Sequence, residues 1–336
     1  MTQPSSTEIE DKHEIEDINS NSLIQELMCN LPGHKNGFIR VKPSEFVFLT
    51  DTKSYLKRIR EFEVRDDDIW ICSFPKCGTT WTQEMIWCLM NNLDFKTANK
   101  VDLDERMAFF EESAITDLKY CDFMDDSIQQ AANMPSPRII KTHLPFQMLP
   151  DQIRTRDKNP KIIHVYRNSR DVCVSLYHHW KILEGFSGNF DLWAKLFLEG
   201  LGGYYCPFWK HVESYYLSRY DNIMFLTYED MKRDLKGIIL DASCFLGCDK
   251  YSENEIAQLE QHLSFKNFQN TPTLNKQHHV DNCYKVGFSN QTEGAAFVRK
   301  GIVGDWKNYL SHEMSEKFRE EDRILCTVTG LVIEDE

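Results

Sequence analysis

The stretch that decides the fold runs Ile69-Trp70-Ile71-Cys72-Ser73-Phe74-Pro75-Lys76-Cys77-Gly78-Thr79-Thr80-Trp81. Its apolar start is typical of a buried strand, and Pro75 predicts where that strand breaks. The residues after it predict a turn that opens a helix, whose first N–H groups and dipole favour a bound anion. The nucleotide P-loop places Lys directly after its last Gly. Here Lys76 precedes Gly78, and no upstream Gly completes that motif. The stretch therefore predicts a P-loop-like phosphate-binding loop of a different kind and disfavours ATP or GTP.

The composition of the 336-residue chain limits its class. Hydrophobic residues make up 41% of it, which is enough for a substantial core. No apolar run reaches the ~18 residues of a membrane span, so no membrane association is expected. The N-terminus lacks the basic and apolar regions of a secretory signal, so we expect a cytoplasmic protein. The net charge of −13 argues against nucleic acid as a partner. The 11 cysteines lack paired CxxC spacing, so we expect reduced thiols and no structural metal.

Two segments differ from the rest of the chain. Residues 1–20 carry six acidic side chains and few large apolar ones, which predicts an acidic, mobile N-terminal tail. Residues 21–336 contain neither an internal repeat nor a Gly/Ser linker, so we expect them to form one domain. Within that domain, residues 115–137 carry scattered acids and end in Met-Pro-Ser-Pro. We expect a long loop or short helices there, forming a lid over a site.

Short apolar runs alternate with helix-like stretches. The predicted buried strands cover residues 69–74, 138–142, 161–166 and 223–228. The predicted helices cover residues 79–91, 169–183, 207–218 and 229–246. This alternation predicts a single α/β domain with a central, mostly parallel sheet flanked by helices. Ligands bind at the carboxyl ends of strands in such sheets, and the phosphate-binding loop follows one of those ends.

Basic side chains follow two further strands. Lys141 and His143 come at the end of the second strand, where strand alternation puts both on one side. Histidine is the side chain most readily used as a base near neutral pH. Arg167 follows the third strand and precedes Asn168, a predicted helix N-cap, so its guanidinium can bind a phosphate through two hydrogen bonds. A surface histidine and a capped helix with a surface arginine are the alternative interpretations.

A third basic stretch, Arg299-Lys300-Gly301, shows neither a helix nor a strand period. Two adjacent cations followed by glycine predict an anion-binding loop, because Gly301 allows the backbone to approach a ligand closely. A solvated basic turn is the alternative. Three aromatic residues beside these elements either stack on an adenine or pack in the core: Trp81, Tyr228 and Phe265.

Together these segments resemble the cytosolic sulfotransferases over roughly residues 40–330. The family's signatures stand here as Phe74 through Trp81, Tyr166-Arg167-Asn168 through Asp171 to Ser175, Arg299-Lys300-Gly301 through Asn308, and Lys141-Thr142-His143-Leu144-Pro145. The resemblance implies an enzyme that uses 3′-phosphoadenosine 5′-phosphosulfate (PAPS) as sulfuryl donor and releases 3′-phosphoadenosine 5′-phosphate (PAP). The acceptor is expected to be a hydroxyl or amine of a small, largely apolar phenol, steroid-like alcohol or catecholamine. No carboxylate cluster for magnesium is evident near these loops, so we expect no metal.

The resemblance also implies a role for each matching residue. His143 is expected to act as general base in an in-line transfer. Lys76 is expected to stabilise the leaving phosphate oxygen, and Lys141 to bind the transferring sulfuryl. The residues implied in donor binding are Lys76, Cys77, Gly78, Thr79 and Thr80 around the 5′-phosphate, Arg167, Ser175, Arg299, Lys300 and Gly301 around the 3′-phosphate, and Trp81, Tyr228 and Phe265 around the adenine.

Two positions depart from the family pattern. Cys77 stands where serine is common, and a thiol is a weaker hydrogen-bonding group. Ser311 and His312 replace the Thr-Val of the family's short dimerisation motif, so a homodimer of that mode does not follow from the sequence.

The acceptor is the least determined part of the hypothesis. An apolar pocket is expected, and the residues that we expect to line it are Phe74, Pro75, Phe109, Phe146, His178 and Trp180. A small-molecule kinase is one alternative, which the order of Lys76 and Gly78 disfavours. A nucleotide sensor without catalysis is another, and the presence of both Lys76 and His143 argues against it.

Overall fold

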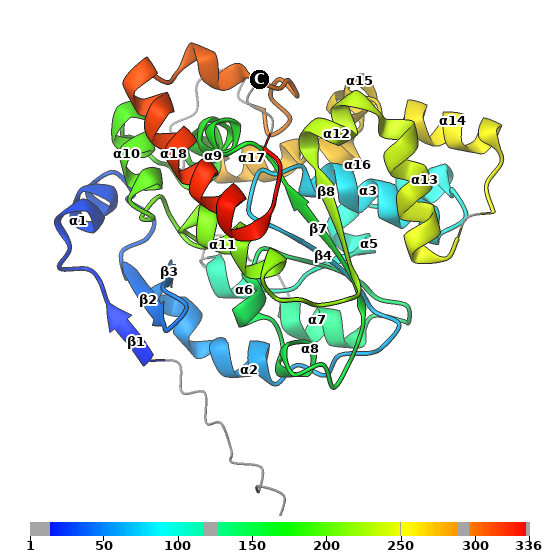
Figure 1. Cartoon of the computed structure of the whole chain (residues 1–336), viewed down its shortest axis with the longest axis horizontal. Coiled ribbons are helices and arrows are strands. Elements are labelled where there is room, and N and C mark those ends of the chain that lie inside the picture. The colour runs from blue at the N-terminus through cyan, green and yellow to red at the C-terminus, as the bar shows by residue number, and fades with distance from the viewer. Residues whose placement is uncertain (1–13, 117–125, 249, 286, 288–295, 334–336) are drawn as a thin grey trace, which may run out of the picture.

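A five-stranded parallel sheet lies at the centre of the protein. The structure is a computed structural model, and it describes residues 14–116, 126–248, 250–285, 287 and 296–333 (Figure 1). The strands in spatial order are β5 (Ala108–Phe109), β6 (Ile139–Thr142), β4 (Ile69–Ser73), β7 (Lys161–Tyr166) and β8 (Ile223–Thr227). Every pairing between neighbours in this sheet is parallel. The predicted single α/β domain with a central parallel sheet is confirmed.

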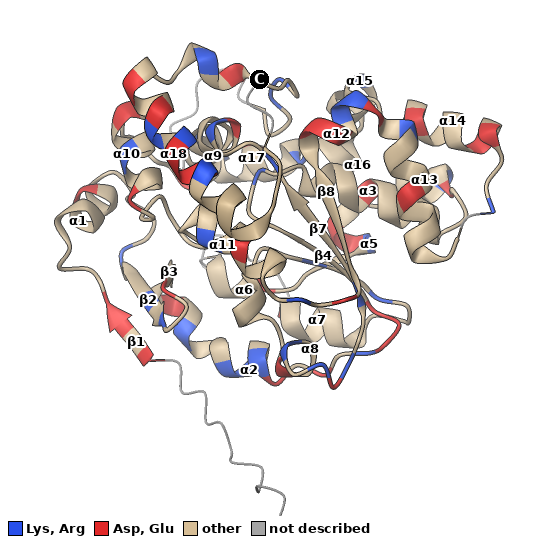
Figure 2. Ribbon diagram, viewed as in Figure 1, with Lys and Arg blue, Asp and Glu red and all other residues tan. Residues whose placement is uncertain are grey.

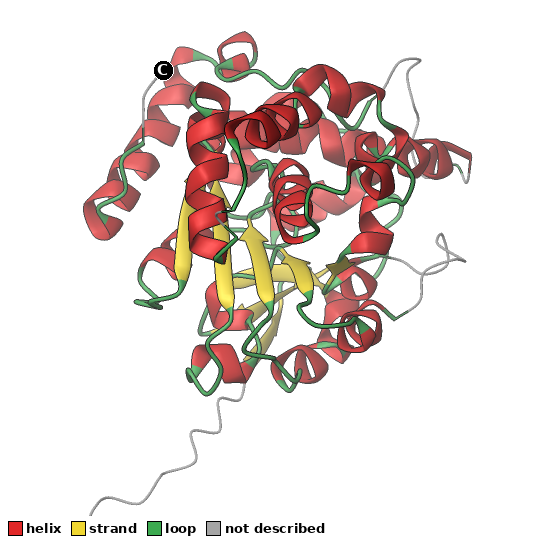
Figure 3. Ribbon diagram, turned by 90° about the vertical axis from the view of Figure 1, so that its right-hand side faces the viewer, coloured by secondary structure: helices red, strands yellow, loops and turns green. Residues whose placement is uncertain are grey.

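Side chains of the central strand alternate between two hydrophobic layers. Trp70 and Cys72 of β4 pack into the layer that contains α9 (Ser169–Leu183), α11 (Phe208–Tyr216) and α18 (His312–Thr329). Ile69 and Ile71 pack into the layer with α3 (Thr79–Met90) and α13 (Leu235–Leu246). Figure 3 shows the strands enclosed between these helices. Burial on both faces explains why the strand sequences are continuous apolar runs instead of alternating ones.

The remaining helices surround this core. The longer ones are α1 (Ser22–Cys29), α7 (Ser127–Asn133), α10 (Phe190–Leu198), α12 (Tyr228–Arg233), α14 (Glu253–His262), α15 (Phe265–Asn270) and α17 (Gln277–Lys285). The short ones are α2 (Leu56–Arg60), α4 (Phe95–Ala98), α5 (Leu103–Arg106), α6 (Glu112–Ile115), α8 (Asp151–Arg154) and α16 (Pro272–Asn275), with 3₁₀ turns η1 (Thr50–Ser54), η3 (Phe146–Met148) and η4 (Asp305–Asn308).

Helix boundaries were predicted closely except in one place. The helix expected over residues 169–183 has those bounds. The single helix expected over residues 229–246 is instead two helices, α12 and α13. Asp234 separates them, because its φ of −143° is not helical. Its side chain accepts a hydrogen bond from the Gly237 amide at 2.9 Å and so caps α13.

The expectation of a mobile tail is wrong for the residues from Glu14 onward. Glu14–Asp17 forms strand β1, which pairs antiparallel with β2 (Phe38–Lys42), and β2 pairs with β3 (Phe46–Leu49). Basic side chains of β2 balance the negative charge of Glu16 in β1. The Glu16 Oε2 lies 3.6 Å from Arg40 Nη1 and 3.3 Å from Lys42 Nζ. The earlier tail residues lie outside the described part. So do residues 117–125 of the expected lid segment, whose described portion contains the short helix α7.

Charge is distributed unevenly over the molecule. Figure 2 shows acidic residues spread over outer helices such as α13, α14 and α18. Of the basic residues that the sequence singled out, Lys76, Lys141 and Arg167 lie instead at the carboxyl ends of β4, β6 and β7. No helix among the described residues has the length and apolarity needed to cross a membrane.

Candidate active site

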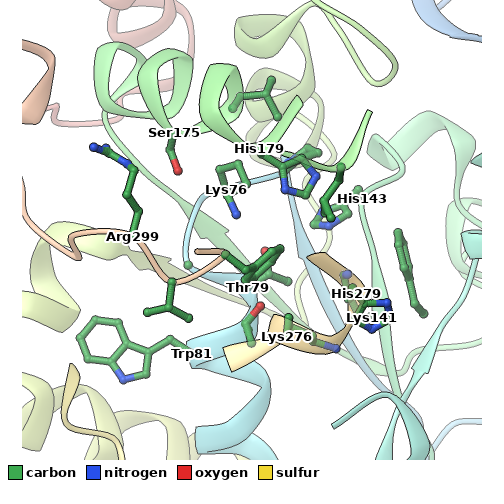
Figure 4. A pocket seen from close by; sticks show the side chains of 18 of the residues that line it. Lys76, Thr79, Trp81, Lys141, His143, Ser175, His179, Lys276, His279 and Arg299 are labelled. Carbon is green, nitrogen blue, oxygen red and sulfur yellow. The ribbon is translucent and has the colours of Figure 1, made fainter. Parts of the chain in front are cut away.

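A cavity of about 340 Å³ opens at the carboxyl ends of the central strands (Figure 4). It collects residues from all the basic segments that the sequence singled out. The predicted site residues that line it are Pro75, Lys76, Gly78, Thr79, Thr80, Trp81, Phe109, Lys141, His143, Arg167, Ser175, Trp180, Tyr228, Phe265, Arg299 and Gly301. The structure thus brings the proposed donor-binding and catalytic segments together around one space.

The loop between β4 and α3 forms the floor of the cavity. Gly78 is the N-cap of α3 with a φ of 100°, and a Cβ at this position would lie 2.8 Å from the Tyr228 ring. Glycine is therefore required there both for its backbone angle and for its size. Lys76 also has a positive φ, 71°, which is uncommon for a residue with a side chain and is typical of functional loops. The N-terminus of this 12-residue helix faces the cavity, as an anion site requires.

Arg167 and Ser175 lie on one wall, before and within α9. Asn168 caps this helix by accepting a hydrogen bond from the Arg170 amide, as predicted. The Arg167 guanidinium lies 4.2 Å from the centre of the Tyr228 ring, and its Nη2 donates to the Ile302 carbonyl at 2.9 Å. Its buried Nε has no hydrogen-bond partner among the described residues. A buried guanidinium N–H without a protein partner remains available to donate a hydrogen bond to an anion.

Two carboxylates fix the Arg299 stretch beside that wall. Asp171 accepts hydrogen bonds from the Gly304 amide at 2.7 Å and from the Trp306 amide at 3.1 Å, which ties this stretch to α9. Asp305 lies 2.6 Å from Arg299. Gly301 has a φ of 62°, and a Cβ there would lie 2.2 Å from the Phe265 ring. In the predicted anion-binding loop, the backbone at Gly301 therefore has a left-handed conformation and packs closely on the Phe265 ring.

Lys76 projects into the middle of the cavity. Its Nζ lies 3.8 Å from the centre of the Phe297 ring. Burial first, and then the charges of Lys141, Arg167 and Arg299, lower the pKa of Lys76 to about 7. A lysine whose ammonium form is destabilised in this way gains strongly from a nearby anion.

His143 is held in one tautomer. Its Nδ1 lies 2.7 Å from the Ser73 carbonyl oxygen, which can only accept a hydrogen bond. The proton therefore resides on Nδ1, and Nε2 keeps an unshared electron pair. Buried Glu111 accepts a hydrogen bond from the His143 amide at 2.6 Å and another from the Tyr205 hydroxyl at 2.9 Å. Burial first, and the Lys141 charge second, hold the pKa of His143 well below its usual range, so the ring is neutral.

The wall beyond His143 combines aromatic and charged groups. The Lys141 Nζ lies 3.6 Å from the centre of the Phe109 ring. Asp104 forms an ion pair with Lys276, and His279 Nε2 lies 3.1 Å from the same carboxylate. Burial first, and the negative charge of Asp104 second, raise the pKa of Glu112 to about 7. These groups come from β5, β6, α5, α6, α17 and the residue before α17, so this wall is assembled from distant parts of the chain.

Five predicted site residues do not line the cavity. Phe74 is fully buried and packs on Phe208 and His211, with ring centres 5.1 and 5.5 Å away. Phe146 packs on Tyr215 in the core. The expectation that these two residues line the acceptor pocket is wrong, because both turn toward the helix layer behind the loop.

The other three are displaced by local geometry. Successive residues of a helix point in different directions, and here His179 lines the cavity while His178 does not. The His178 Nε2 lies instead 3.0 Å from the Tyr309 hydroxyl. The Cys77 side chain is fully buried beneath the loop, and burial raises the pKa of its thiol. Lys300 Nζ lies 2.8 Å from Asp305 Oδ1. The expectation that His178 lines the acceptor pocket is therefore wrong. Donor binding through the backbone N–H of Cys77 and through Lys300 stays a prediction.

Several lining residues were not anticipated from the sequence. His179 could have been found, because it lies one helical turn beyond Ser175 and so shares its face of α9. Phe297 lies two residues before Arg299, in the same loop. No local signal marks Asp104, Lys276 or His279, which reach the cavity only through tertiary packing.

One buried cluster elsewhere has the composition of a metal site. Glu84, Cys88 and His262 place their ligand atoms within 4.8 Å of one another. The two oxygens of Glu84 already lie 2.7 Å from Arg106 and 2.6 Å from His262. Burial raises the pKa of the Cys88 thiol, which keeps it protonated. The cluster therefore fits a buried ion network that joins α3 to α5 and α14 better than a metal site.

Comparisons with known proteins agree on one family. The family model of the sulfotransferase domain matches residues 66–321. The luciferin sulfotransferase of Photinus pyralis is 37% identical over 298 residues, which cover 85% of this chain and 78% of that protein. The amine sulfotransferase of Oryctolagus cuniculus is 34% identical over 282 residues, covering 82% and 85%. The crystal structure of retinol dehydratase in complex with androsterone and inactive cofactor PAP matches with a TM-score of 0.84 and 26% identity, covering 97% and 99% of the two chains.

Proposed function

The chain belongs to the sulfotransferase family, and from this premise we propose that it transfers the sulfuryl group of PAPS to a small acceptor. The acceptor is a hydroxyl or amine of a largely apolar molecule, such as a phenol, a steroid-like alcohol or a catecholamine. One observation carries the proposal: the phosphate-binding loop, the two arginine sites and His143 line the same cavity. PAPS is a co-substrate in this scheme and supplies the sulfuryl group.

The donor end suits a ligand with two separate phosphates. The loop at Gly78, Thr79 and Thr80 offers backbone N–H groups at the start of α3 for the 5′-phosphate. Arg167 and Arg299 would bind the 3′-phosphate, and each has a buried guanidinium nitrogen without a hydrogen-bond partner among the described residues. These unused donors support a bound phosphate at this end of the cavity.

The aromatic residues at this end support an adenine site. Trp81, Tyr228 and Phe265 all line the cavity, and the rings of Trp81 and Tyr228 lie 5.7 Å apart. Trp81 is held in place because its Nε1 donates to the Leu263 carbonyl at 2.9 Å. Flat aromatic walls of this kind suit a purine base.

His143 is positioned to take the proton of the acceptor. Its unprotonated Nε2 would accept that proton while the acceptor oxygen or nitrogen forms a bond to sulfur. The bond between sulfur and the 5′-phosphate oxygen breaks in the same step, and its electron pair remains on that oxygen. Lys76 would stabilise the charge that develops there, and Lys141 would bind the sulfuryl oxygens. The net change converts acceptor and PAPS into the sulfated acceptor, PAP and a proton.

A transfer assay tests this proposal. The purified protein is incubated with PAPS labelled on sulfur and with a panel of phenols, steroid-like alcohols and catecholamines. We expect labelled product with at least one acceptor class, and about 10²- to 10⁴-fold less of it with the His143→Ala variant. The absence of transfer by a folded protein that binds PAP would contradict the proposal, as would magnesium-dependent turnover of ATP by the same preparation.

A further inference from the structure

His179 on α9 lines the cavity and has no role in the scheme above. Its Nδ1 is buried and has no hydrogen-bond partner among the described residues. Because His179 lines the cavity while its Nδ1 is buried, we infer that the Nε2 edge of the ring faces the cavity. The imidazole therefore presents one nitrogen to the protein and the other to the space where a ligand would lie.

The surroundings of the ring indicate which nitrogen carries the proton. Burial first, and the charges of Lys76 and Lys141 next, hold the pKa of His179 well below its usual range, so the ring is neutral. Nδ1 has no hydrogen-bond partner among the described residues, so a hydrogen there would stay unpaired, whereas a hydrogen on Nε2 can be donated to a ligand oxygen in the cavity. The favoured tautomer therefore leaves Nδ1 as the unpaired acceptor and places the hydrogen on Nε2. This is the opposite tautomer to that of His143, whose Nδ1 donates to the Ser73 carbonyl.

The position of the His179 imidazole indicates which group its Nε2–H can contact. Phe297 contacts both His179, with ring centres 5.7 Å apart, and the Nζ of Lys76, 3.8 Å from its ring centre. Figure 4 shows His179 beside Lys76 and His143, and the Lys76 charge acts on His179. The breaking and forming bonds to sulfur are expected there, between the phosphate-binding loop and the base.

We propose that His179 is a further catalytic residue, whose Nε2–H donates a hydrogen bond to an oxygen of the transferring sulfuryl group. This inference rests on the proposed function. A neutral donor adds stabilisation where charge develops, and it adds no further positive charge that would retain the anionic product. His143 accepts a proton from the acceptor while His179 donates a hydrogen bond to the sulfuryl, so the two histidines act from opposite tautomers on the same reaction.

The test compares three variants in binding and in turnover. His179→Phe removes the N–H, His179→Gln keeps an amide N–H, and His178→Phe is the matched control on the adjacent position. Affinities for PAPS and for PAP are measured by titration calorimetry without acceptor. In His179→Phe we expect the ratio of the PAPS to the PAP dissociation constant to rise about 5- to 10-fold, because the lost hydrogen bond touches only the sulfuryl. We expect kcat to fall about 10- to 100-fold.

The two other variants sharpen this expectation. His179→Gln should lie between the wild type and His179→Phe in both quantities, and His178→Phe should match the wild type. Unchanged PAP affinity in each variant shows that the donor site is intact. An unchanged PAPS-to-PAP ratio in His179→Phe would overturn the inference, and so would equal losses in the Phe and Gln variants. A higher acceptor KM alone would assign His179 to acceptor binding instead. Failure of the wild type to transfer sulfuryl would reject the proposed function, whereas the binding ratio would still test His179.

Discussion

The proposed donor and acceptor ends of the cavity are built in different ways. The donor end consists of one strand-to-helix loop and two basic segments, which Asp171 and Asp305 hold in place. The acceptor end is a wall of side chains from separate elements, including Phe109 on β5 and Lys276 before α17. A ligand with fixed phosphates can be recognised by short local motifs. A variable acceptor is recognised by a surface that only tertiary packing creates.

The largest effect is expected at the boundary between the two ends. His143→Ala should lower kcat by about 10²- to 10⁴-fold, because the acceptor loses its general base. The affinity for PAP should stay within about twofold, because His143 faces the acceptor and contacts no phosphate in the proposed scheme. Initial rates with labelled PAPS and calorimetric titration with PAP check both values. A variant that keeps more than a tenth of the activity would place the base elsewhere.

A change confined to the donor end should reduce donor affinity only. Arg167→Met should weaken PAP binding about 10- to 100-fold, because it removes charge-assisted hydrogen bonds to phosphate. The acceptor KM at saturating donor should not change. Arg167→Lys should restore only part of the affinity, because an ammonium lacks the two-pronged geometry of guanidinium. Thermal unfolding of both variants controls for the lost contact to the Ile302 carbonyl, and wild-type affinity in Arg167→Met would contradict the account.

The pH dependence of donor binding follows from Lys76. In the protein without ligand its pKa is lowered to about 7, mainly by burial. A bound anion favours the ammonium form, so binding raises this pKa and takes up a proton. PAP affinity should therefore be highest below pH 7 and fall by up to about tenfold per unit as the pH rises above 7.

Calorimetry in buffers of different ionisation enthalpy measures this proton uptake directly. Lys76→Met is the control, and it should bind PAP with little pH dependence between pH 7 and 9. Measurements stay above pH 7 because phosphate itself titrates near pH ~6. An unchanged proton uptake in Lys76→Met would assign the effect to another group.

The smallest effect is expected at the acceptor end. Lys276→Gln breaks the ion pair with Asp104 that connects the start of α17 to α5. We expect the acceptor KM to rise about threefold, the scale of a weakened, partly exposed ion pair. PAP affinity should stay the same, because Lys276 lies away from the arginine sites. Steady-state kinetics at saturating PAPS measure the change, and a loss of PAP affinity would show that the two ends are not independent.

The same division explains what the sequence could predict. The four main strands, the Asn168 cap and most donor-end residues follow local patterns, and the structure places them as expected. Phe74 and Phe146 were misplaced at the acceptor end, because apolarity alone does not distinguish a pocket wall from the core behind it. His178 was chosen instead of His179, although helical spacing from Ser175 favours the latter. Lys276 and Asp104 are far apart in the sequence, so no local sequence pattern predicts their ion pair.

The central claim is that one cavity binds both phosphates of a nucleotide next to the general base, His143. A crystal structure of the protein with PAP tests this claim most directly. The account predicts the 5′-phosphate at the amides of Gly78, Thr79 and Thr80, and the 3′-phosphate between Arg167 and Arg299. It also predicts that His143 Nε2 faces the open space next to the 5′-phosphate. PAP bound outside this cavity, or with its 3′-phosphate away from both arginines, would contradict the account.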